Sequence, residues 1–224
     1  EKVTGQAAHT GVQSWRLTSG FSRASDGTPH SPRLDVDVGK PATGAAANRL
    51  NVSFWFKPAA PGDESKVILG PGADDPTLDF ASTQVQLVNA EEGVLVRTLT
   101  HAGAGSGGAF STENLHRTPL NASVWNRFQM MGSWSNPEYG DNWVYAINGE
   151  LVDGGNTYSA FFSWRRDEFH EDHVTTNWIK FRTTTNVDPS AGTVVGARGF
   201  YFDDIEMVAA ADETVLDSWS TSFE

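Results

Sequence analysis

Basic, amide and aromatic side chains recur at alternate positions of several short runs in this chain. Guanidinium and ammonium groups pair with carboxylates, amides hydrogen-bond to hydroxyl groups, and indole rings stack on sugar rings. An oligosaccharide site needs this mixture, and its positive charge favours an acidic glycan such as a uronic-acid polymer. The residues concerned are Gln86, Arg97, Arg127, Trp178, Lys180 and Arg182.

Two further aromatic residues, Trp134 and Tyr139, lie in a polar stretch that also contains Gly and Pro, between positions 133 and 142. Aromatic rings on such a loop are candidates for a platform on which a sugar stacks. An alternative stays open for the basic and amide positions, because the solvated face of an ordinary antiparallel sheet is also polar.

Three acidic residues near the C-terminus, Asp203, Asp204 and Glu206, are candidate ligands for calcium. Adjacent residues of a strand point to opposite faces, so Asp203 and Asp204 cannot both bind one ion unless a bulge intervenes. One of them, with Glu206 and backbone carbonyls, would form an oxygen site. The alternative is that either Asp accepts hydrogen bonds from a loop backbone.

A catalytic alternative is β-elimination on a uronic-acid polymer. In such a lyase Arg97 or Arg182 would neutralise the substrate carboxylate, His101 would abstract the proton, and Tyr145 would return it. The sequence lacks the motifs of two other kinds of site. No Gly-x-Ser-x-Gly motif is present for a serine nucleophile, and His170 and His173 do not have the His-Glu-x-x-His spacing of a zinc site.

Short strands must position all of these residues. Runs with period-2 alternation, rich in Val, Phe, Trp and Thr, are separated by clusters of Gly, Asn, Asp and Pro, which predicts an all-β sandwich or barrel. Asn148-Gly149 between two such runs predicts a tight hairpin. The predicted strands are 12–17, 50–57, 83–88, 94–101, 125–131, 143–147, 177–183 and 199–208.

Alternation also sorts each strand into a core face and an outer face. Leu50, Val52, Phe54 and Phe56 share one side of their run, which we predict to be the core. The same rule places the candidate ligand residues on the opposite side of their own strands. If those strands belong to one sheet, the candidate residues form a single surface.

The composition of the chain excludes several classes of function. The chain has 224 residues, with 16 Lys and Arg against 28 Asp and Glu, a net charge of −12. This charge argues against general binding to nucleic acid or to an anionic membrane. The absence of cysteine excludes disulfides and thiolate sites, and no run of 18 apolar residues is present for membrane insertion. We expect one domain over residues 1–224.

Four segments resemble the concanavalin A-like and laminin-G-like jelly-roll family. The segment AHTGVQSWRL at 8–17 resembles an opening strand common in secreted bacterial jelly rolls, and LNVSFWFKP at 50–58 resembles a laminin-G core strand. WNRF at 125–128 followed by VYAINGELV at 144–152 resembles the central hairpin of the family. GFYFDDIE at 199–206 resembles the last strand of many carbohydrate-binding modules, where an Asp often binds structural calcium.

The resemblance implies an antiparallel two-sheet β-sandwich, secreted or at the cell surface, that binds polysaccharide and belongs to a larger multidomain protein. We therefore expect a non-catalytic binding module for an acidic glycan. The alternatives are a polysaccharide lyase on the same sheet face and a protein-binding adhesion module. The cofactor expected from the resemblance is a structural calcium ion.

Overall fold

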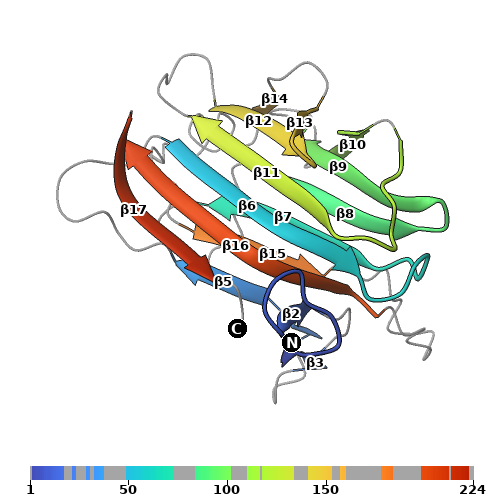
Figure 1. Cartoon of the computed structure of the whole chain (residues 1–224). Coiled ribbons are helices and arrows are strands. Elements are labelled where there is room, and N and C mark those ends of the chain that lie inside the picture. Colours follow the sequence, from blue (N-terminus) through green and yellow to red (C-terminus); the bar gives the residue numbers. More distant parts are fainter. Residues whose placement is uncertain are drawn as a thin grey trace.

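The computed structural model is built almost entirely from short antiparallel strands, which Figure 1 shows in chain order. The described residues contain no helix. The structure describes residues 2–17, 22–23, 29–30, 33–37, 49–72, 84–101, 110–116, 118–133, 141–152, 157–159, 178–183, 198–211 and 213–221.

The first layer is a nine-stranded sheet, called here the front sheet, which faces the viewer in Figure 1. Its main path runs in the order β1 (Lys2–Thr4), β2 (Ser14–Leu17), β16 (Phe200–Ala211), β6 (Arg49–Pro58), β11 (Asn126–Ser133), β12 (Asp141–Ile147) and β13 (Glu150–Leu151). Two more strands join it: β14 (Thr157–Ser159) pairs with β12, and β17 (Thr214–Thr221) pairs with β16.

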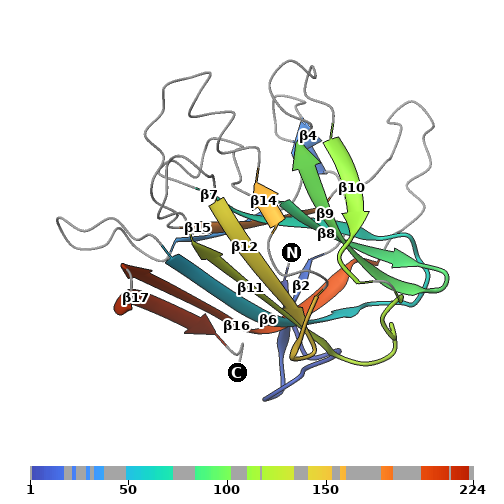
Figure 2. The same ribbon diagram turned by 90° about the horizontal axis from the view of Figure 1, so that it is seen from above.

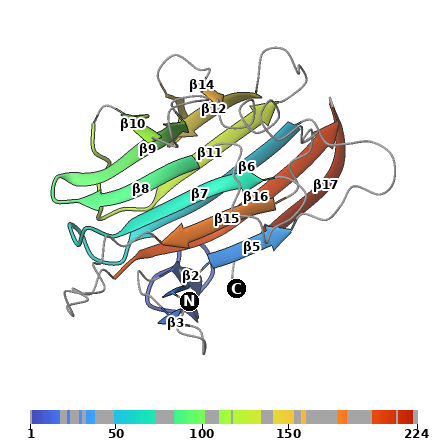
Figure 3. The same ribbon diagram turned by 180° about the vertical axis from the view of Figure 1, so that it is seen from behind.

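The second layer is a six-stranded sheet, called here the back sheet, which faces the viewer in Figure 3. Its order is β10 (Phe110–Asn114), β9 (Gly93–His101), β8 (Gln84–Ala90), β7 (Lys66–Gly72), β15 (Trp178–Thr183) and β5 (Arg33–Asp37). A separate two-stranded pair is formed by β3 (Ser22–Arg23) and β4 (Pro29–His30). Figure 2 shows the front and back sheets as two layers.

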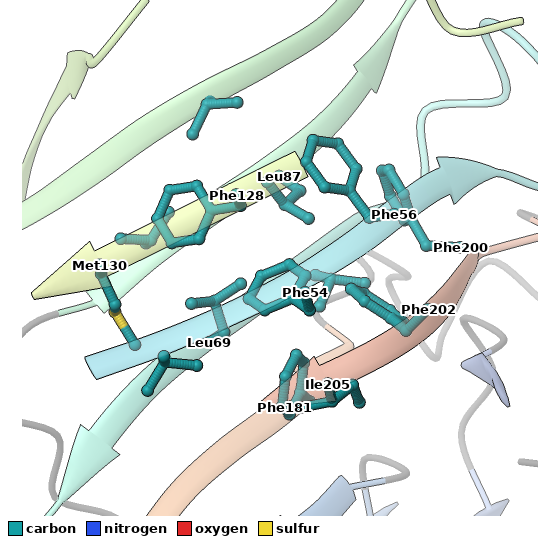
Figure 4. Close-up of a cluster of buried hydrophobic side chains, with 14 of the residues drawn as sticks. Phe54, Phe56, Leu69, Leu87, Phe128, Met130, Phe181, Phe200, Phe202 and Ile205 are labelled. Carbon is teal, nitrogen blue, oxygen red and sulfur yellow. The ribbon is translucent and has the colours of Figure 1, made fainter. Parts of the chain in front are cut away.

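Aromatic side chains from both layers fill the space between the sheets (Figure 4). Phe181 of the back sheet meets Phe54 and Phe202 of the front sheet, with ring centroids 5.4 Å and 5.2 Å apart. Trp15 packs edge-on against the same Phe181 at 5.6 Å. The side chains of Phe54, Phe181 and Phe202 have no solvent exposure, so burial of these rings holds the two layers together.

The predicted fold class, an all-β antiparallel two-sheet sandwich, is confirmed. Each predicted strand is present, and its ends lie within three residues of the prediction. The predicted core face is also correct: Leu50, Val52, Phe54 and Phe56 are all buried.

The hairpin predicted at Asn148-Gly149 joins β12 to β13. Both residues have positive φ, 52° and 86°, as a two-residue hairpin turn of this type requires. Asn148 adds contacts of its own, because its Oδ1 accepts a hydrogen bond from the Arg127 backbone N–H at 2.8 Å and its Nδ2 lies 3.1 Å from Asn126 Oδ1.

Other strands escape prediction. β7 ends in Gly70-Pro71-Gly72, residues that are typical of turns, yet it lies at the centre of the back sheet between β8 and β15. β5 and β10 lie within stretches that the sequence presents as long polar insertions. β5 and β7 pair with β15, from a distant part of the chain, whereas β10 pairs with the preceding strand β9. Local composition carries no record of such pairing.

Candidate functional site

The back sheet presents its outer face away from the core, and buried neighbours identify the outward positions. Val67 and Leu69 of β7, Val85 and Leu87 of β8, and Val94 and Val96 of β9 are fully buried. The residues that alternate with them therefore lie on the outer face. On β15 the buried residue is Phe181, which assigns positions 180 and 182 to the same face.

Registers join four of these outward positions into one line across the sheet. Arg182 of β15 is opposite Ile68 of β7, Ile68 is opposite Gln86 of β8, and Gln86 is opposite Arg97 of β9. Three strand spacings of about 4.8 Å place the Arg97 and Arg182 positions roughly 14 Å apart. Three candidate ligand positions, 86, 97 and 182, thus fall on one line across the sheet. Two belong to the consecutive strands β8 and β9, and one belongs to the distant strand β15.

Two further candidates, Lys180 and Trp178, occupy positions of the same parity as Arg182 on β15. Lys180 is opposite Gly70, and Trp178 is opposite Gly72. His101, the candidate base of the lyase alternative, lies four residues after Arg97 on β9 and so has the same parity. The structure therefore collects one amide, three basic residues, one tryptophan and one histidine on one sheet.

Arg127 requires a correction. It lies on β11 of the front sheet, opposite Trp55 of β6, so it cannot share a surface with Arg97 and Arg182. Its Nη2 lies 3.4 Å from Ser53 Oγ, and Ser53 Oγ lies 3.4 Å from Glu206 Oε2. The alternation rule correctly turned Arg127 away from the core, but alternation does not specify the sheet to which a strand belongs.

Tyr145 requires a second correction. It lies on β12 of the front sheet and is only 3% exposed, with its ring 6.0 Å from that of Phe128 in the core. A phenol in that position cannot donate a proton to a substrate on the outer face of the back sheet. In the lyase alternative that combined Arg97, His101 and Tyr145, the assignment of Tyr145 as the proton donor is therefore wrong.

The remaining aromatic candidates, Trp134 and Tyr139, lie outside the described residues. Their expected role as a stacking platform stays a prediction.

Asp203 and Asp204 are brought to the same side by a bulge. The register between β16 and β6 shifts between Asp203 and Glu206, and Asp204 has a φ of 46°. Two residues of β16 are thereby inserted opposite one residue of β6, which interrupts the alternation. Both carboxylates consequently reach one loop, residues 5–13, between β1 and β2.

Asp203 accepts three backbone hydrogen bonds. Its Oδ2 accepts from His9 N at 2.8 Å and from Thr10 N at 3.3 Å, and its Oδ1 accepts from Asp204 N at 2.9 Å. The side chain is fully buried. Burial raises the pKa of this carboxyl because it disfavours the charged form, while the N–H groups of His9, Asp204 and Thr10 act in the opposite direction.

Asp204 binds the side chains of the same loop. Its Oδ2 lies 2.7 Å from His9 Nδ1, and its Oδ1 accepts from Thr10 Oγ1 at 2.5 Å. The His9 ring stacks on Trp55 at 3.8 Å and meets Trp125 edge-on at 5.9 Å. The N-terminal loop is therefore fastened to the outer face of the front sheet, where Figure 1 shows it crossing β16.

These hydrogen bonds decide how well the acidic residues fit calcium. Both oxygens of Asp203 and both oxygens of Asp204 already have protein partners. Glu206 is exposed, and its Oε2 lies 3.4 Å from Ser53 Oγ. Among the described residues no group of three or more acidic or histidine side chains could hold a metal ion. The arrangement fits the alternative reading, in which Asp carboxylates satisfy a loop backbone.

Two features of these surfaces were not found from the sequence. Arg33 lies on β5 opposite Arg182, in a segment outside the strands predicted from the sequence. His9 belongs to the opening motif, but nothing in the sequence linked it to Asp204, which lies 195 residues away. Both relations depend on pairing between distant segments.

No protein family matches the sequence, and no curated protein matches it. Solved structures with a similar arrangement include a family 66 carbohydrate-binding module from Bacillus subtilis, with 8% identity, a TM-score of 0.41, and coverage of 85% of this chain and 92% of that one. A family 7 alginate lyase with bound product has 8% identity and a TM-score of 0.47, with 85% and 83% covered.

A third similar structure is a GH16 protein for mixed-linkage glucan from Bacteroides ovatus, with 12% identity, a TM-score of 0.48, and 89% and 81% covered. Such identities and TM-scores say nothing about which chemistry this chain performs. No helix in the described part of the chain is long and apolar enough to cross a membrane.

Proposed function

We propose that this chain is a non-catalytic module that binds an acidic polysaccharide on the outer face of its back sheet. The observation that carries the proposal is the line of Arg182, Ile68, Gln86 and Arg97 positions across four neighbouring strands. A linear polymer that crosses the strands would meet a guanidinium at each end of this line and an amide within it. Guanidinium groups bind carboxylates through paired hydrogen bonds.

Charge distribution supports an acidic ligand. At the outward positions of the described back-sheet strands, five basic residues stand against two acidic ones, whereas the whole chain carries a net charge of −12. A basic surface on an acidic protein raises the local concentration of anions only there. The basic residues are Arg33, Lys66, Arg97, Lys180 and Arg182, and the acidic ones are Asp35 and Asp37.

Binding without cleavage is favoured by the position of the tyrosines. A lyase of the kind considered needs an acid beside its base, on the substrate face. The tyrosines that the structure describes, Tyr145, Tyr158 and Tyr201, all belong to the front sheet. The proposed setting is extracellular, where acidic polysaccharides occur, and the module would be one part of a larger polypeptide.

Affinity electrophoresis in gels that contain polygalacturonate tests the proposal. We expect the wild-type protein to be retarded, and Arg182→Ala to weaken binding by about 1–3 kcal/mol because a charge-assisted contact is lost. Arg127→Ala is the matched control, since it removes an arginine from the front sheet. Its retardation should equal that of the wild type.

The same samples separate the alternatives. If unsaturated products are detected by their ultraviolet absorbance, the protein is a lyase and the proposal of a non-catalytic binding module is wrong. Absence of both retardation and products, for carboxylated and sulfated polymers alike, would reject the polysaccharide proposal and leave protein adhesion. Equal losses in Arg182→Ala and Arg127→Ala would remove the back-sheet face from the site.

A further inference from the structure

The turn between β12 and β13 contains Asn148 followed by Gly149, and both residues are exposed. No other asparagine in the sequence precedes a glycine. Because glycine has no Cβ, its backbone nitrogen can closely approach the side-chain carbonyl carbon of the asparagine before it. A Cβ placed on Gly149 would meet nothing within 4 Å, so the described residues leave this side of the turn open. The dipeptide therefore has the composition and the exposure that deamidation requires.

Hydrogen bonds hold the Asn148 side chain toward the start of β11. Its Oδ1 accepts from the Arg127 backbone N–H at 2.8 Å, and its Nδ2 donates to Asn126 Oδ1 at 3.1 Å. Asn126 is only 2% exposed, and its own Nδ2 donates to the backbone carbonyls of Asn121 at 3.0 Å and Val124 at 3.1 Å. These two donations fix which atom of the Asn126 amide is the oxygen. Both polar atoms of the Asn148 amide are therefore engaged in the closed hairpin.

We propose that Asn148 is a modification site, converted to aspartate or isoaspartate at a rate that opening of the β12–β13 hairpin controls. The Gly149 nitrogen attacks Asn148 Cγ, the bond from Cγ to Nδ2 breaks, and ammonia leaves with the proton of the Gly149 N–H. Water then opens the cyclic imide at either carbonyl, so the reaction consumes one water and needs no other reactant. The side chain must first leave its partners on β11.

The position of the hairpin makes such opening a local event. β13 has two residues and is the last strand on the main path of the front sheet, beside β12 (Figure 1). Segments with few contacts at the end of a sheet open without global unfolding. The Asn148 amide can therefore reach Gly149 while the core stays folded.

The products cannot make the same contacts. Aspartate has no Nδ2 donor, and its carboxylate would face Asn126 Oδ1, which is also an acceptor. Isoaspartate adds one carbon to the backbone of a two-residue turn, so the pairing of Ile147 with Glu150 loses its register. Either product also adds one negative charge to an acidic chain. The modification therefore weakens the hairpin and makes its further opening easier.

The rate of modification in the wild type tests the control by the hairpin. The protein is kept at mildly alkaline pH, folded or unfolded in urea, and peptide mapping measures aspartate and isoaspartate at each asparagine. In the folded protein we expect product at Asn148 before any other asparagine, formed at least about tenfold more slowly than in the unfolded chain, because only open molecules react. Equal rates in the two states, earlier product at another asparagine of the folded protein, or folded protein that stays unmodified long after the unfolded chain is converted would overturn the proposal.

A pair of variants isolates the contact with Asn126. Asn126→Ala removes the acceptor of Asn148 Nδ2 and should speed the reaction several-fold in the folded protein but not in urea. Asn121→Ala is the matched control, because it changes the neighbouring turn and leaves both side-chain contacts of Asn148 in place. Equal native rates in the two variants would remove Asn126 from the control. The comparison of folded with unfolded wild type needs no variant, so it decides the proposal even if Asn126→Ala fails to fold.

A second pair measures the effect of the product on stability. Asn148→Asp has the sequence of one product and should have a lower thermal midpoint than the wild type. Asn121→Asp adds the same charge to an exposed turn and keeps an oxygen that accepts the Ser123 backbone N–H, so its midpoint should be unchanged. An Asn148→Asp midpoint equal to that of Asn121→Asp would overturn the claim that modification weakens the hairpin.

Discussion

At the scale of single residues, Asp203 is the polar group on which the N-terminal loop depends most. Its carboxylate is fully buried and accepts hydrogen bonds from the backbone N–H groups of His9, Thr10 and Asp204. A methyl group in its place would leave these donors without an acceptor. A buried donor left unsatisfied costs about 1–3 kcal/mol, so loss of this carboxylate would weaken the attachment of the loop, which Asp204 and Trp55 also contact.

We expect Asp203→Ala to lower the free energy of unfolding by about 2–3 kcal/mol. Urea denaturation followed by tryptophan fluorescence measures the change, because Trp55 contacts His9 of the same loop. Glu206→Ala removes an exposed carboxylate from the same strand and should cost less than about 0.5 kcal/mol. Equal losses in the two variants would contradict the role assigned to Asp203.

The raised pKa of Asp203 gives this residue a pH signature. The folded protein takes up the proton at a higher pH than the unfolded chain, whose carboxyl has the ordinary value of 3.8. The contribution of Asp203 to stability therefore increases as pH falls through its raised pKa, and the full desolvation cost acts above it. The unfolding free energy of the wild type, relative to Asp203→Asn, should rise on mild acidification.

At the scale of elements, two turn glycines differ in what surrounds them. Gly149 in the β12–β13 hairpin has a φ of 86°, and a Cβ placed there would meet nothing within 4 Å. Gly93, at the start of β9, has a φ of 135°, and a Cβ there would lie 2.4 Å from the carbonyl oxygen of Leu120. That carbonyl accepts the hydrogen bond of Val94 at 2.9 Å, so it cannot move away freely.

We expect Gly149→Ala to cost about 1 kcal/mol, from positive φ alone. Gly93→Ala should cost at least about 3 kcal/mol, because backbone strain and overlap with Leu120 add together. Thermal unfolding of the two variants side by side measures the difference. A Gly93→Ala protein as stable as Gly149→Ala would show that the Leu120 segment can move.

A polar cluster joins three further elements. Asn89, buried at the end of β8, donates from Nδ2 to Ala60 O at 2.6 Å and to Asp63 Oδ1 at 2.5 Å. Asp63 Oδ2 accepts from the Arg198 backbone N–H at 2.6 Å. The loop after β6, the end of β8 and the segment before β16 are therefore held at one point. These hydrogen bonds therefore connect strand ends of the front sheet to a strand end of the back sheet.

At the scale of the whole molecule, charge is unevenly distributed. The chain has a net charge of −12, yet the strand positions assigned by register to the outer face of the back sheet hold more basic than acidic residues. Repulsion among the excess acidic groups destabilises the folded state, whereas attraction to an acidic polymer acts at the basic face. Added salt screens both effects.

A salt titration should therefore change stability and binding in opposite directions. Between roughly 0.01 M and roughly 0.1 M salt the Debye length falls from about 30 Å to about 10 Å. Over that range we expect the thermal midpoint of the free protein to rise and its affinity for polygalacturonate to fall. Sodium chloride serves as the salt, and neutral dextran serves as the control polymer. Affinity that rises with salt would contradict an electrostatic contact.

Much of the architecture was predictable because strand alternation is a local property. Phe54 and Phe56 alternate with Ser53, Trp55 and Lys57, and a backbone of period two turns these sets to opposite faces wherever the strand lies. The Asn148-Gly149 turn was predictable for a similar reason, since positive φ at adjacent residues is a local requirement. Fold class, core face and hairpin all follow from such short-range constraints.

Only the tertiary structure decided which strands share a sheet and where alternation is broken. Arg127 and Arg182 obey the same local rule, yet long-range pairing assigns them to different sheets. Asp203 and Asp204 meet one loop because a bulge, defined only by pairing with β6, interrupts the alternation. The sequence by itself determined which side of a regular strand each residue occupies. Hydrogen bonding between distant segments decided where alternation breaks and which residues became neighbours, because pairing energies depend on contacts that no local pattern records.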